Sequence, residues 1–423
     1  MRIDNFYHKM VISLLIYFVC SYFGLFAGYY AANVFLACLI LLIIFFLVMQ
    51  KIELVKISNF PVVWQLLLIY LTFNALLNLP SSILYLIAFF AGLLVLCLKS
   101  DERDYQVIIK YLQLISITLA FSIYLQAFIP DVFYDIAKLW FFYSNQYELV
   151  HYTGNVVHQF SGAFYEVSFS AFVLSIGYSI IFCKMLLHKS IKNKNLIYLI
   201  IVYGAIILTG KRSFILLLPA VSLYVFLLHN GIRLTISRII VYLIMIVVFI
   251  VNFIQFQEVI LGVLGKGDAD VIELSSREYF WRIAIDMIEE SPVVGGGLNS
   301  YDANFNNSGI RDMQYSFAGA HNSYIQIFAE TGIIGAILFA YAIYKTYACA
   351  FKNMYYYKLT RGYYKYFLNL FAIFSLTNIL LYSVTGNVFY QPQQLIFFFL
   401  LSNIIYHTKI RKEVEHEDTS SCG

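Results

Sequence analysis

The chain has 423 residues, of which 61% are hydrophobic and 18% aromatic, whereas only 12% are charged. An ordinary soluble domain carries roughly 25% charged residues, and the 28 basic and 24 acidic side chains here are too few to cover a globule of this size. The composition excludes a water-soluble globular protein, and the placement of the charges is more informative than the net charge of +4.

Apolar runs of about 17 to 22 residues, long enough to cross a bilayer, recur along the chain. We predict an all-α polytopic membrane protein with about twelve transmembrane helices in a single domain, 1–407, followed by a cytoplasmic tail, 408–423. The first run lacks a small-residue cleavage site, so it is expected to remain as an anchor. The predicted spans are 11–30, 32–49, 61–79, 82–98, 106–129, 167–187, 196–210, 213–228, 239–256, 324–347, 367–384 and 393–407.

The basic residues predict which side each connection faces. With both termini in the cytoplasm, 21 of the 28 lysines and arginines fall on or near that side, in agreement with the positive-inside rule. Two outer segments, 130–166 and 257–323, are long, and loops of such length are uncommon unless they bind or catalyse. We therefore expect the functional site on the outer face. The seven basic residues left there are Lys138, Lys211, Arg212, Lys266, Arg277, Arg282 and Arg311.

The shortest outer connection carries two adjacent cations. Lys211 and Arg212 lie in the sequence Leu208-Thr-Gly-Lys-Arg-Ser213, between predicted spans seven and eight, where the positive-inside rule has most force. Cations at the outer mouth of a helix hairpin favour an anion-binding site, to which Ser213 and the exposed N–H groups of span eight would add donors. The alternative is that both cations meet lipid phosphates of the outer leaflet.

The second long outer segment contains a predicted amphipathic helix that begins at Ser275 and ends before Pro292. Ser275 and Glu278 have the spacing of a capping box. After Pro292, Gly295 and Gly297 are expected in a turn whose free amides could approach a phosphate closely. A plain helix stop explains most of this pattern, so the glycines are weaker candidates than the charged residues.

Two arginines of this helix fall on different faces. At about 100° per residue, Arg277 lies on the apolar face with Trp281 and Ala284. Arg282 lies on the opposite face, four residues before Asp286, where a solvated ion pair accounts for it. An arginine on an apolar face needs an anionic partner, so Arg277 is the predicted functional residue.

His321 opens predicted span ten at the outer interface. A lone histidine in such a place is more often a satisfied interfacial residue than a catalyst. Here, however, His321-Asn322 is followed at fixed spacing by Gly332 and Gly335, which is a long and specific pattern. The glycines are expected to allow close helix packing in the bilayer. The pattern makes His321 a candidate catalytic residue and Asn322 a candidate binding residue.

Together these motifs resemble the O-antigen polymerase and ligase family, multi-pass enzymes that handle undecaprenyl-diphosphate-linked glycans at the outer face of the bacterial inner membrane. The resemblance is sharp over about 205–340 and only topological elsewhere. The matching residues, motif by motif, are His321, Asn322, Gly332 and Gly335; Thr209, Gly210 and Arg212; and Arg277, Trp281, Pro292, Gly295 and Gly297.

The resemblance implies glycosyl transfer from a lipid diphosphate donor by an all-helical enzyme. Arg212 and Arg277 would hold the diphosphate, with Lys211 assisting, because a bidentate guanidinium suits the charge that grows as the anomeric bond breaks. His321 would accept the proton of the attacking hydroxyl or orient it. A single displacement would invert the anomeric centre. The further residues expected to contact substrate are Ser213, Asn322, Gly295, Gly297 and Trp281.

No metal or other cofactor is predicted. Asp268-Ala-Asp270 has the form of the metal-binding motif of soluble glycosyltransferases, but three residues are a weak signal. Two arginines already supply the charge that a divalent ion would provide. The outward-facing His151 and His158 lack a ligand constellation.

Polymerase and ligase share the donor and differ in the acceptor, which is a second lipid-linked repeat unit or the outer-core sugar of lipopolysaccharide. The aromatic residues of 130–166 offer faces for sugar stacking and favour a polymerase, although an interfacial aromatic belt would have the same composition. The expected partners are the undecaprenyl-diphosphate-linked donor and acceptor, membrane lipids and a chain-length regulator protein. No nucleic-acid partner is expected.

A lipid-linked oligosaccharide flippase is the alternative from another class. A flippase should carry cations along its central spans, whereas mid-span charges are nearly absent here and Glu330 is the deepest candidate. The outward cations gather on one face, as expected of an enzyme that works at one surface. We therefore predict an inner-membrane enzyme with both termini in the cytoplasm and its active site facing the periplasm.

Overall fold

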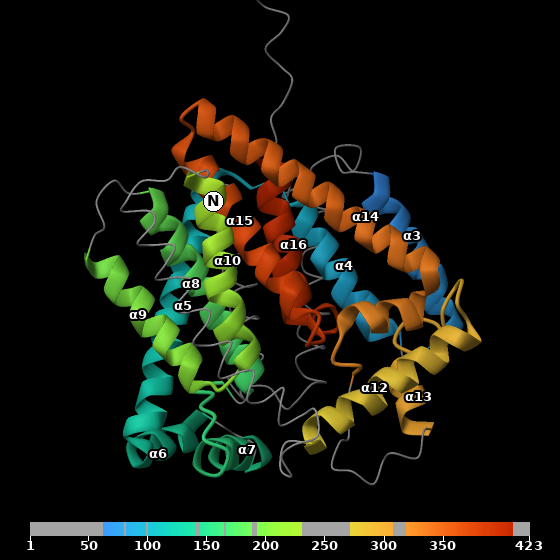
Figure 1. Ribbon diagram of the computed structural model, residues 1–423, viewed down its shortest axis with the longest axis horizontal. Coiled ribbons are helices and arrows are strands. Elements are labelled where there is room, and N and C mark those ends of the chain that lie inside the picture. Colours follow the sequence, from blue (N-terminus) through green and yellow to red (C-terminus); the bar gives the residue numbers. More distant parts are fainter. Residues whose placement is uncertain are drawn as a thin grey trace, which may run out of the picture.

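The computed structural model describes residues 62–79, 82–98, 100–140, 144–164, 166–187, 193–230, 271–307 and 319–408. These residues form helices joined by turns, and no strand occurs among them (Figure 1). Helices suit so apolar a chain because a helix satisfies its backbone hydrogen bonds within one segment, as the bilayer interior requires. The predicted all-α architecture of a polytopic membrane protein is confirmed.

Nine of the twelve predicted spans coincide with helices, and the other three, 11–30, 32–49 and 239–256, lie outside the described residues. By length and composition, five of the nine helices can cross a membrane: α5, α8, α10, α14 and α15. The nine are α3 (Val62–Ala75), α4 (Ile83–Cys97), α5 (Glu102–Phe128), α8 (Val167–Leu187), α9 (Asn193–Leu208), α10 (Arg212–Asn230), α14 (Ser323–Leu359), α15 (Tyr363–Tyr382) and α16 (Pro392–His407).

The helices alternate in direction, so the described connections gather at two ends of the bundle (Figure 1). One end, lowest in Figure 1, holds α6 (Pro130–Trp140), α7 (Ser144–Asn155), α12 (Val271–Glu290) and α13 (Tyr301–Asn307), and we call it the site end. The opposite end, which carries the α14–α15 turn, is the far end. Both segments predicted to form long outer loops therefore have their described helices at the same end.

Buried polar side chains join the helices inside the apolar core. Asn403 of α16 is 1% exposed, and its amide Nδ2 donates to the carbonyl oxygens of Val95, Leu96 and Leu98 at 2.8–3.0 Å, where α4 ends. Its Oδ1 accepts from the hydroxyl of Tyr105 at 2.6 Å. The amide thus ties the carbonyl groups at the end of α4 to α16.

Two predicted boundaries are wrong. Helix α12 begins at Val271, so Ser275 lies inside the helix and the predicted capping box does not start it. Helix α14 continues to Leu359, twelve residues beyond the predicted end of span ten. The extension of α14 includes the good helix formers Ala348 and Lys352, so the helix continues past the end of the apolar run.

Candidate functional site

The Thr-Gly-x-Arg motif forms the tight turn between α9 and α10. Gly210 ends α9 with a φ of +67°, a left-handed conformation that glycine adopts without steric cost. The buried hydroxyl of Thr209 donates to the carbonyl of Ile206 at 2.6 Å and accepts from the N–H of Lys211 at 3.3 Å. Arg212 is then the first residue of α10, where its position is fixed by the turn.

The cations of this turn lie at the site end. Lys211 and Ser213 are partly buried, whereas Arg212 is exposed. No carboxylate of the described residues pairs with Arg212. The turn packs against the first long outer segment, because the N–H of Phe160 donates to the carbonyl of Leu208 at 3.1 Å. Within the described part of the chain, the Arg212 side chain thus lies exposed at the site end without an acidic partner.

Helix α12 buries one face against α13 and the start of α14. Its buried residues are Phe280, Ile283, Ala284 and Met287, which recur at helical spacing. Trp281, which we predicted on this face, is 37% exposed, because the buried stripe is centred one residue earlier than expected. The placement of Trp281 on a membrane- or core-facing surface stays a prediction.

The two arginines of α12 lie at different positions relative to this buried stripe. Arg282 is exposed, as predicted. Position 277 is helical and precedes Phe280 by three residues and Ala284 by seven, which is the spacing of the buried face. The backbone thus places Arg277 one turn before Phe280, the residue of α12 that contacts the next motif.

His321 lies where the chain enters α14. Its φ is +49°, a left-handed conformation that is uncommon for a residue with a side chain. The imidazole centroid is 5.5 Å from that of the Phe280 ring. Asn322 caps α14, since its Oδ1 accepts from the N–H groups of Tyr324 at 3.0 Å and Ile325 at 3.2 Å. The capping contact directs the Asn322 oxygen toward α14. The left-handed backbone of His321 sets the direction of its imidazole.

Contacts through α15 connect His321 to the Arg212 turn. The N–H of Ser323 donates to the carbonyl of Ser383 at 2.9 Å, at the end of α15. The neighbouring ring of Tyr382 packs on Phe214, two residues after Arg212, with 4.4 Å between centroids. The turn carrying Arg212, the helix carrying Arg277 and the start of α14 are therefore brought to one end of the fold.

The glycine motifs interlock in a way that the sequence did not predict. Helix α14 is broken at Gly332, whose φ is +62° and ψ −172°. At the break, the carbonyls of Ala329 and Glu330 accept from the N–H groups of Gly296 and Gly297, both at 3.0 Å. The N–H groups of Ile333 and Ile334 donate instead to the carbonyls of residues 292 and 293, at 3.0 and 3.4 Å. We call this replacement of α14 hydrogen bonds by the 292–297 loop the splice.

The splice explains why these positions are glycines. A Cβ on Gly295 would lie 2.3 Å from the backbone of Glu330, and a Cβ on Gly332 would lie 2.2 Å from the carbonyl oxygen of Val293. The expected free amides at 295–297 are not present, because each of these N–H groups donates to a carbonyl. Gly335 does pack closely, as predicted, since a Cβ there would be 2.9 Å from the ring of Tyr70 in α3.

Glu330 is a buried carboxylate beside the splice, and sequence reasoning gave it no role at the site. It is fully buried, and its oxygens accept from the N–H of Asn299 at 2.8 Å, the N–H of Tyr301 at 3.3 Å and Nε2 of Gln326 at 3.1 Å. Three donors thus converge on this one side chain and hold the loop in place. The sequence feature that points to Glu330 is its place in the glycine motif, as an acidic residue directly before Thr331-Gly332. Its contacts show that it fixes the segment between α12 and α13 onto α14.

Among the described residues, no group of His, Cys, Asp and Glu could hold a metal ion. Asp268 and Asp270 lie outside these residues. His151 lies beside Asn155, with 3.0 Å between Nε2 and Nδ2, and its ring packs on that of Tyr134 at a tilt of 50°, with 4.9 Å between centroids. His158 lies between α7 and α8 with a left-handed backbone. The two outward histidines are thus placed apart from any described ligand cluster.

The fold and the location of the three motifs define an all-α integral membrane protein with a candidate site at one end of its helical bundle. Residues 197–340, about a third of the chain, match the family model described as O-antigen ligase. Arg212, Arg277, His321 and Gly332 all fall inside it. The match indicates a membrane enzyme that transfers glycosyl groups from lipid-linked sugars. No curated protein matches the chain.

Proposed function

We propose that the protein is a polymerase of O-antigen or a related surface polysaccharide, which joins undecaprenyl-diphosphate-linked repeat units at the periplasmic face of the bacterial inner membrane. The observation that carries the proposal is the convergence at the site end of the Arg212 turn, helix α12 and His321, all within the region that matches the family. An enzyme that works at one membrane surface requires such a one-sided arrangement of charge.

In this proposal the two arginines hold the donor. Arg212, exposed and unpaired with any described carboxylate, binds one side of the diphosphate, with Lys211 and Ser213 beside it. Arg277, carried by α12, is assigned to the other side. Guanidinium groups stabilise the diphosphate most when it carries its full leaving-group charge, so they lower the barrier for breaking the anomeric carbon–oxygen bond. No metal ion is needed for this task.

His321 acts on the acceptor. The acceptor hydroxyl oxygen attacks the anomeric carbon, the bond from that carbon to the diphosphate oxygen breaks, and undecaprenyl diphosphate leaves. The hydroxyl proton passes to a nitrogen of the imidazole, which acts as the general base. Attack opposite the leaving group inverts the anomeric centre.

Ligase activity is the second candidate, because the matching family model is described as an O-antigen ligase. The first long outer segment supports the polymerase instead. Its helices α6 and α7 hold Tyr134, Tyr147 and His151 within 6.3 Å of one another between centroids, at the site end. These rings pack at tilted or edge-on angles, and α7 also carries the exposed ring of Tyr152. An exposed aromatic face can bind a sugar, and a polymerase must accommodate a second repeat unit.

The variants Arg212→Ala, Arg277→Ala and His321→Ala in a host that lacks the native gene test the site. Each is expected to abolish polymer, because each removes a group used in the transition state. Arg282→Ala is the matched control on the exposed face of α12 and should spare polymer. Normal long-chain glycan from the Arg277→Ala strain would overturn the site assignment.

The banding of lipopolysaccharide in the null strain separates the two candidates. Lipid A-core carrying a single repeat unit identifies a polymerase, because ligation then proceeds without chain growth. Bare core together with accumulated lipid-linked polymer identifies a ligase.

A further inference from the structure

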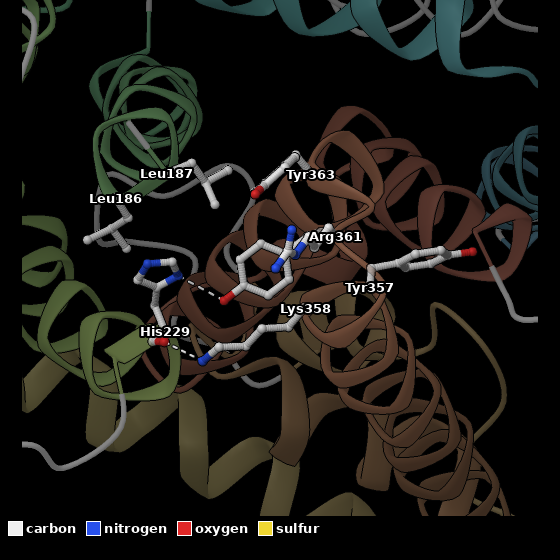
Figure 2. Close-up of a pocket in the computed structure, with 8 residues that line it drawn as sticks. Leu186, Leu187, His229, Tyr357, Lys358, Arg361 and Tyr363 are labelled. Atoms are coloured by element: carbon white, nitrogen blue, oxygen red, sulfur yellow. Dashed lines mark hydrogen bonds between the residues drawn. The ribbon is translucent and has the colours of Figure 1, made fainter. Parts of the chain in front are cut away.

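A separate pocket lies at the far end of the bundle, where α8 and α10 end and the chain turns from α14 into α15 (Figure 2). Its volume is about 230 Å³. At about 30 Å³ for each water molecule, this is room for roughly seven waters, or for a small charged group with part of its attached chain. The pocket belongs to none of the three motifs, and the proposed function does not use it.

The walls of the pocket are of two kinds. Leu186 and Leu187, the last residues of α8, form an apolar side. His229, Lys358, Arg361 and three tyrosines form the rest, and no acidic side chain contributes to the lining. Figure 2 shows the labelled histidine, lysine and arginine on neighbouring elements around the cavity. This lining combines hydrogen-bond donors and positive charge with an apolar wall. It suits an anion that carries an attached carbon chain.

The polar groups of the pocket are held in place. Nδ1 of His229 and the hydroxyl oxygen of Tyr366 are 2.8 Å apart and share one hydrogen bond. In either tautomer of a neutral imidazole the two side chains together carry two polar hydrogens, and only one of them lies in this bond. The ammonium of Lys358 donates to the main-chain carbonyl of His229, at the end of α10.

Arg361 has a backbone conformation that a glycine would adopt more easily. It lies in the turn after α14 with a φ of +58°, the left-handed conformation in which helices commonly end on glycine. A residue with a Cβ is disfavoured there, and the next residue is a glycine that could have supplied the turn. No hydrogen bond or ion pair of its guanidinium involves a described residue. The arginine therefore does not serve the turn, whereas its charge lines the pocket.

Cations at helix C-termini also have a purely local effect, because they offset the negative end of the helix dipole. This accounts for the bond from Lys358 to the end of α10. It does not account for the cavity or for the left-handed Arg361, because a glycine would end α14 with less strain.

We propose that this far-end pocket binds a phosphate group, with Arg361 and Lys358 contacting the phosphate oxygens and Leu186 and Leu187 beside the attached chain. In the predicted topology the far end faces the cytoplasm, so an anionic phospholipid headgroup of the inner leaflet can enter the pocket from the side. A soluble phosphate ester presents the same group, and the experiment below distinguishes the two sources.

The test uses the full-length protein purified in mild detergent. Native mass spectrometry counts phosphatidylglycerol and phosphatidylcholine retained by wild-type protein and by Arg361→Gly, Lys358→Ala and Lys352→Ala. Arg361→Gly removes the guanidinium and relieves the left-handed strain, so a loss of binding cannot come from unfolding. A juxtamembrane charge contributes about a fivefold change in binding, and we expect about fivefold less phosphatidylglycerol on Arg361→Gly and on Lys358→Ala. Lys352→Ala, an exposed α14 cation outside the pocket, should match wild type.

A parallel titration with inorganic phosphate, read as a shift in melting temperature, identifies the source. Phosphatidylglycerol retention that depends on Arg361, without a phosphate-induced shift, supports a lipid headgroup. A phosphate-induced shift that Arg361→Gly abolishes, without selective lipid retention, supports a soluble phosphate ester. Equal phosphatidylglycerol retention by wild type and Arg361→Gly, together with equal phosphate responses, overturns the proposal.

Discussion

The backbone of His321 distinguishes it from an ordinary interfacial histidine. A φ of +49° disfavours any residue with a Cβ by about 1–2 kcal/mol, so the chain keeps an imidazole where a glycine would be more stable. The sequence pattern identified this residue but not its conformation, because the left-handed turn depends on the Asn322 cap and on the anchoring of Ser323 to the end of α15.

Two substitutions separate the imidazole from its backbone. We expect both His321→Gly and His321→Ala to abolish polymer, since both remove the proton acceptor. The glycine variant should be more stable than the alanine variant by about 1–2 kcal/mol, because only alanine retains the left-handed strain. Lipopolysaccharide banding and the melting temperature of the purified variants measure the two effects. Wild-type polymer from His321→Gly would contradict the proposed role of the imidazole.

Asp302 in α13 gives a pH-dependent prediction. Burial raises the pKa of this carboxyl above its ordinary value of 3.8. An acid with a raised folded-state pKa favours the folded state most below its unfolded-state pKa, and this contribution is lost as the pH rises through the folded-state value. Asp302→Asn should therefore raise the melting temperature at neutral pH, with a gain that shrinks as the pH falls to about 4. A gain that grows on acidification would contradict this assignment.

At the scale of elements, the sequence predicted which helices form better than how they end and interlock. Nine spans were located from apolar runs because burial in a bilayer imposes length and composition. The splice was not predictable, because hydrogen bonds between residues about 35 positions apart leave no periodic signal. Its only trace was the glycines, which were interpreted as a phosphate-binding turn and as small packing residues.

The splice makes glycine substitutions unequal. Gly332→Ala and Gly295→Ala place a Cβ within 2.3 Å of backbone atoms and also require a positive φ, so each should cost at least about 1–2 kcal/mol of stability. Gly296→Ala is the matched control. Its Cβ would meet only the ends of the Ser300 and Met287 side chains, at 3.0 and 3.2 Å, which can move. Thermal unfolding of the three variants checks the order, and equal losses for all three would contradict the splice as the cause.

At the scale of the whole molecule, the placement of the basic residues predicted which connections lie at the same end of the helical bundle. The two long segments predicted on one side of the membrane have their described helices at one end, and the α14–α15 turn lies at the other (Figure 1). Which end faces the periplasm is a prediction from the positive-inside rule.

Cysteine labelling tests that orientation. Tyr152 in α7 and Tyr363 at the start of α15 are 56% and 70% exposed, at opposite ends. In intact cells, an impermeant thiol reagent should label Tyr152→Cys, and it should label Tyr363→Cys only after the membrane is permeabilised. The predicted topology leaves the native cysteines within spans or on the inner side, so they should not react from outside. The reverse pattern would place the candidate site in the cytoplasm.

The break at Gly332 has a mechanical consequence. The 292–297 loop bonds to α14 on both sides of the break, at residues 329 and 330 before it and at residues 333 and 334 after it. The break therefore does not act as a free hinge, because the loop bridges the two parts of the helix as a brace. Helix α12, which leads into this loop, is fixed in direction to both parts of α14, so the geometry between position 277 and His321 is set by the brace.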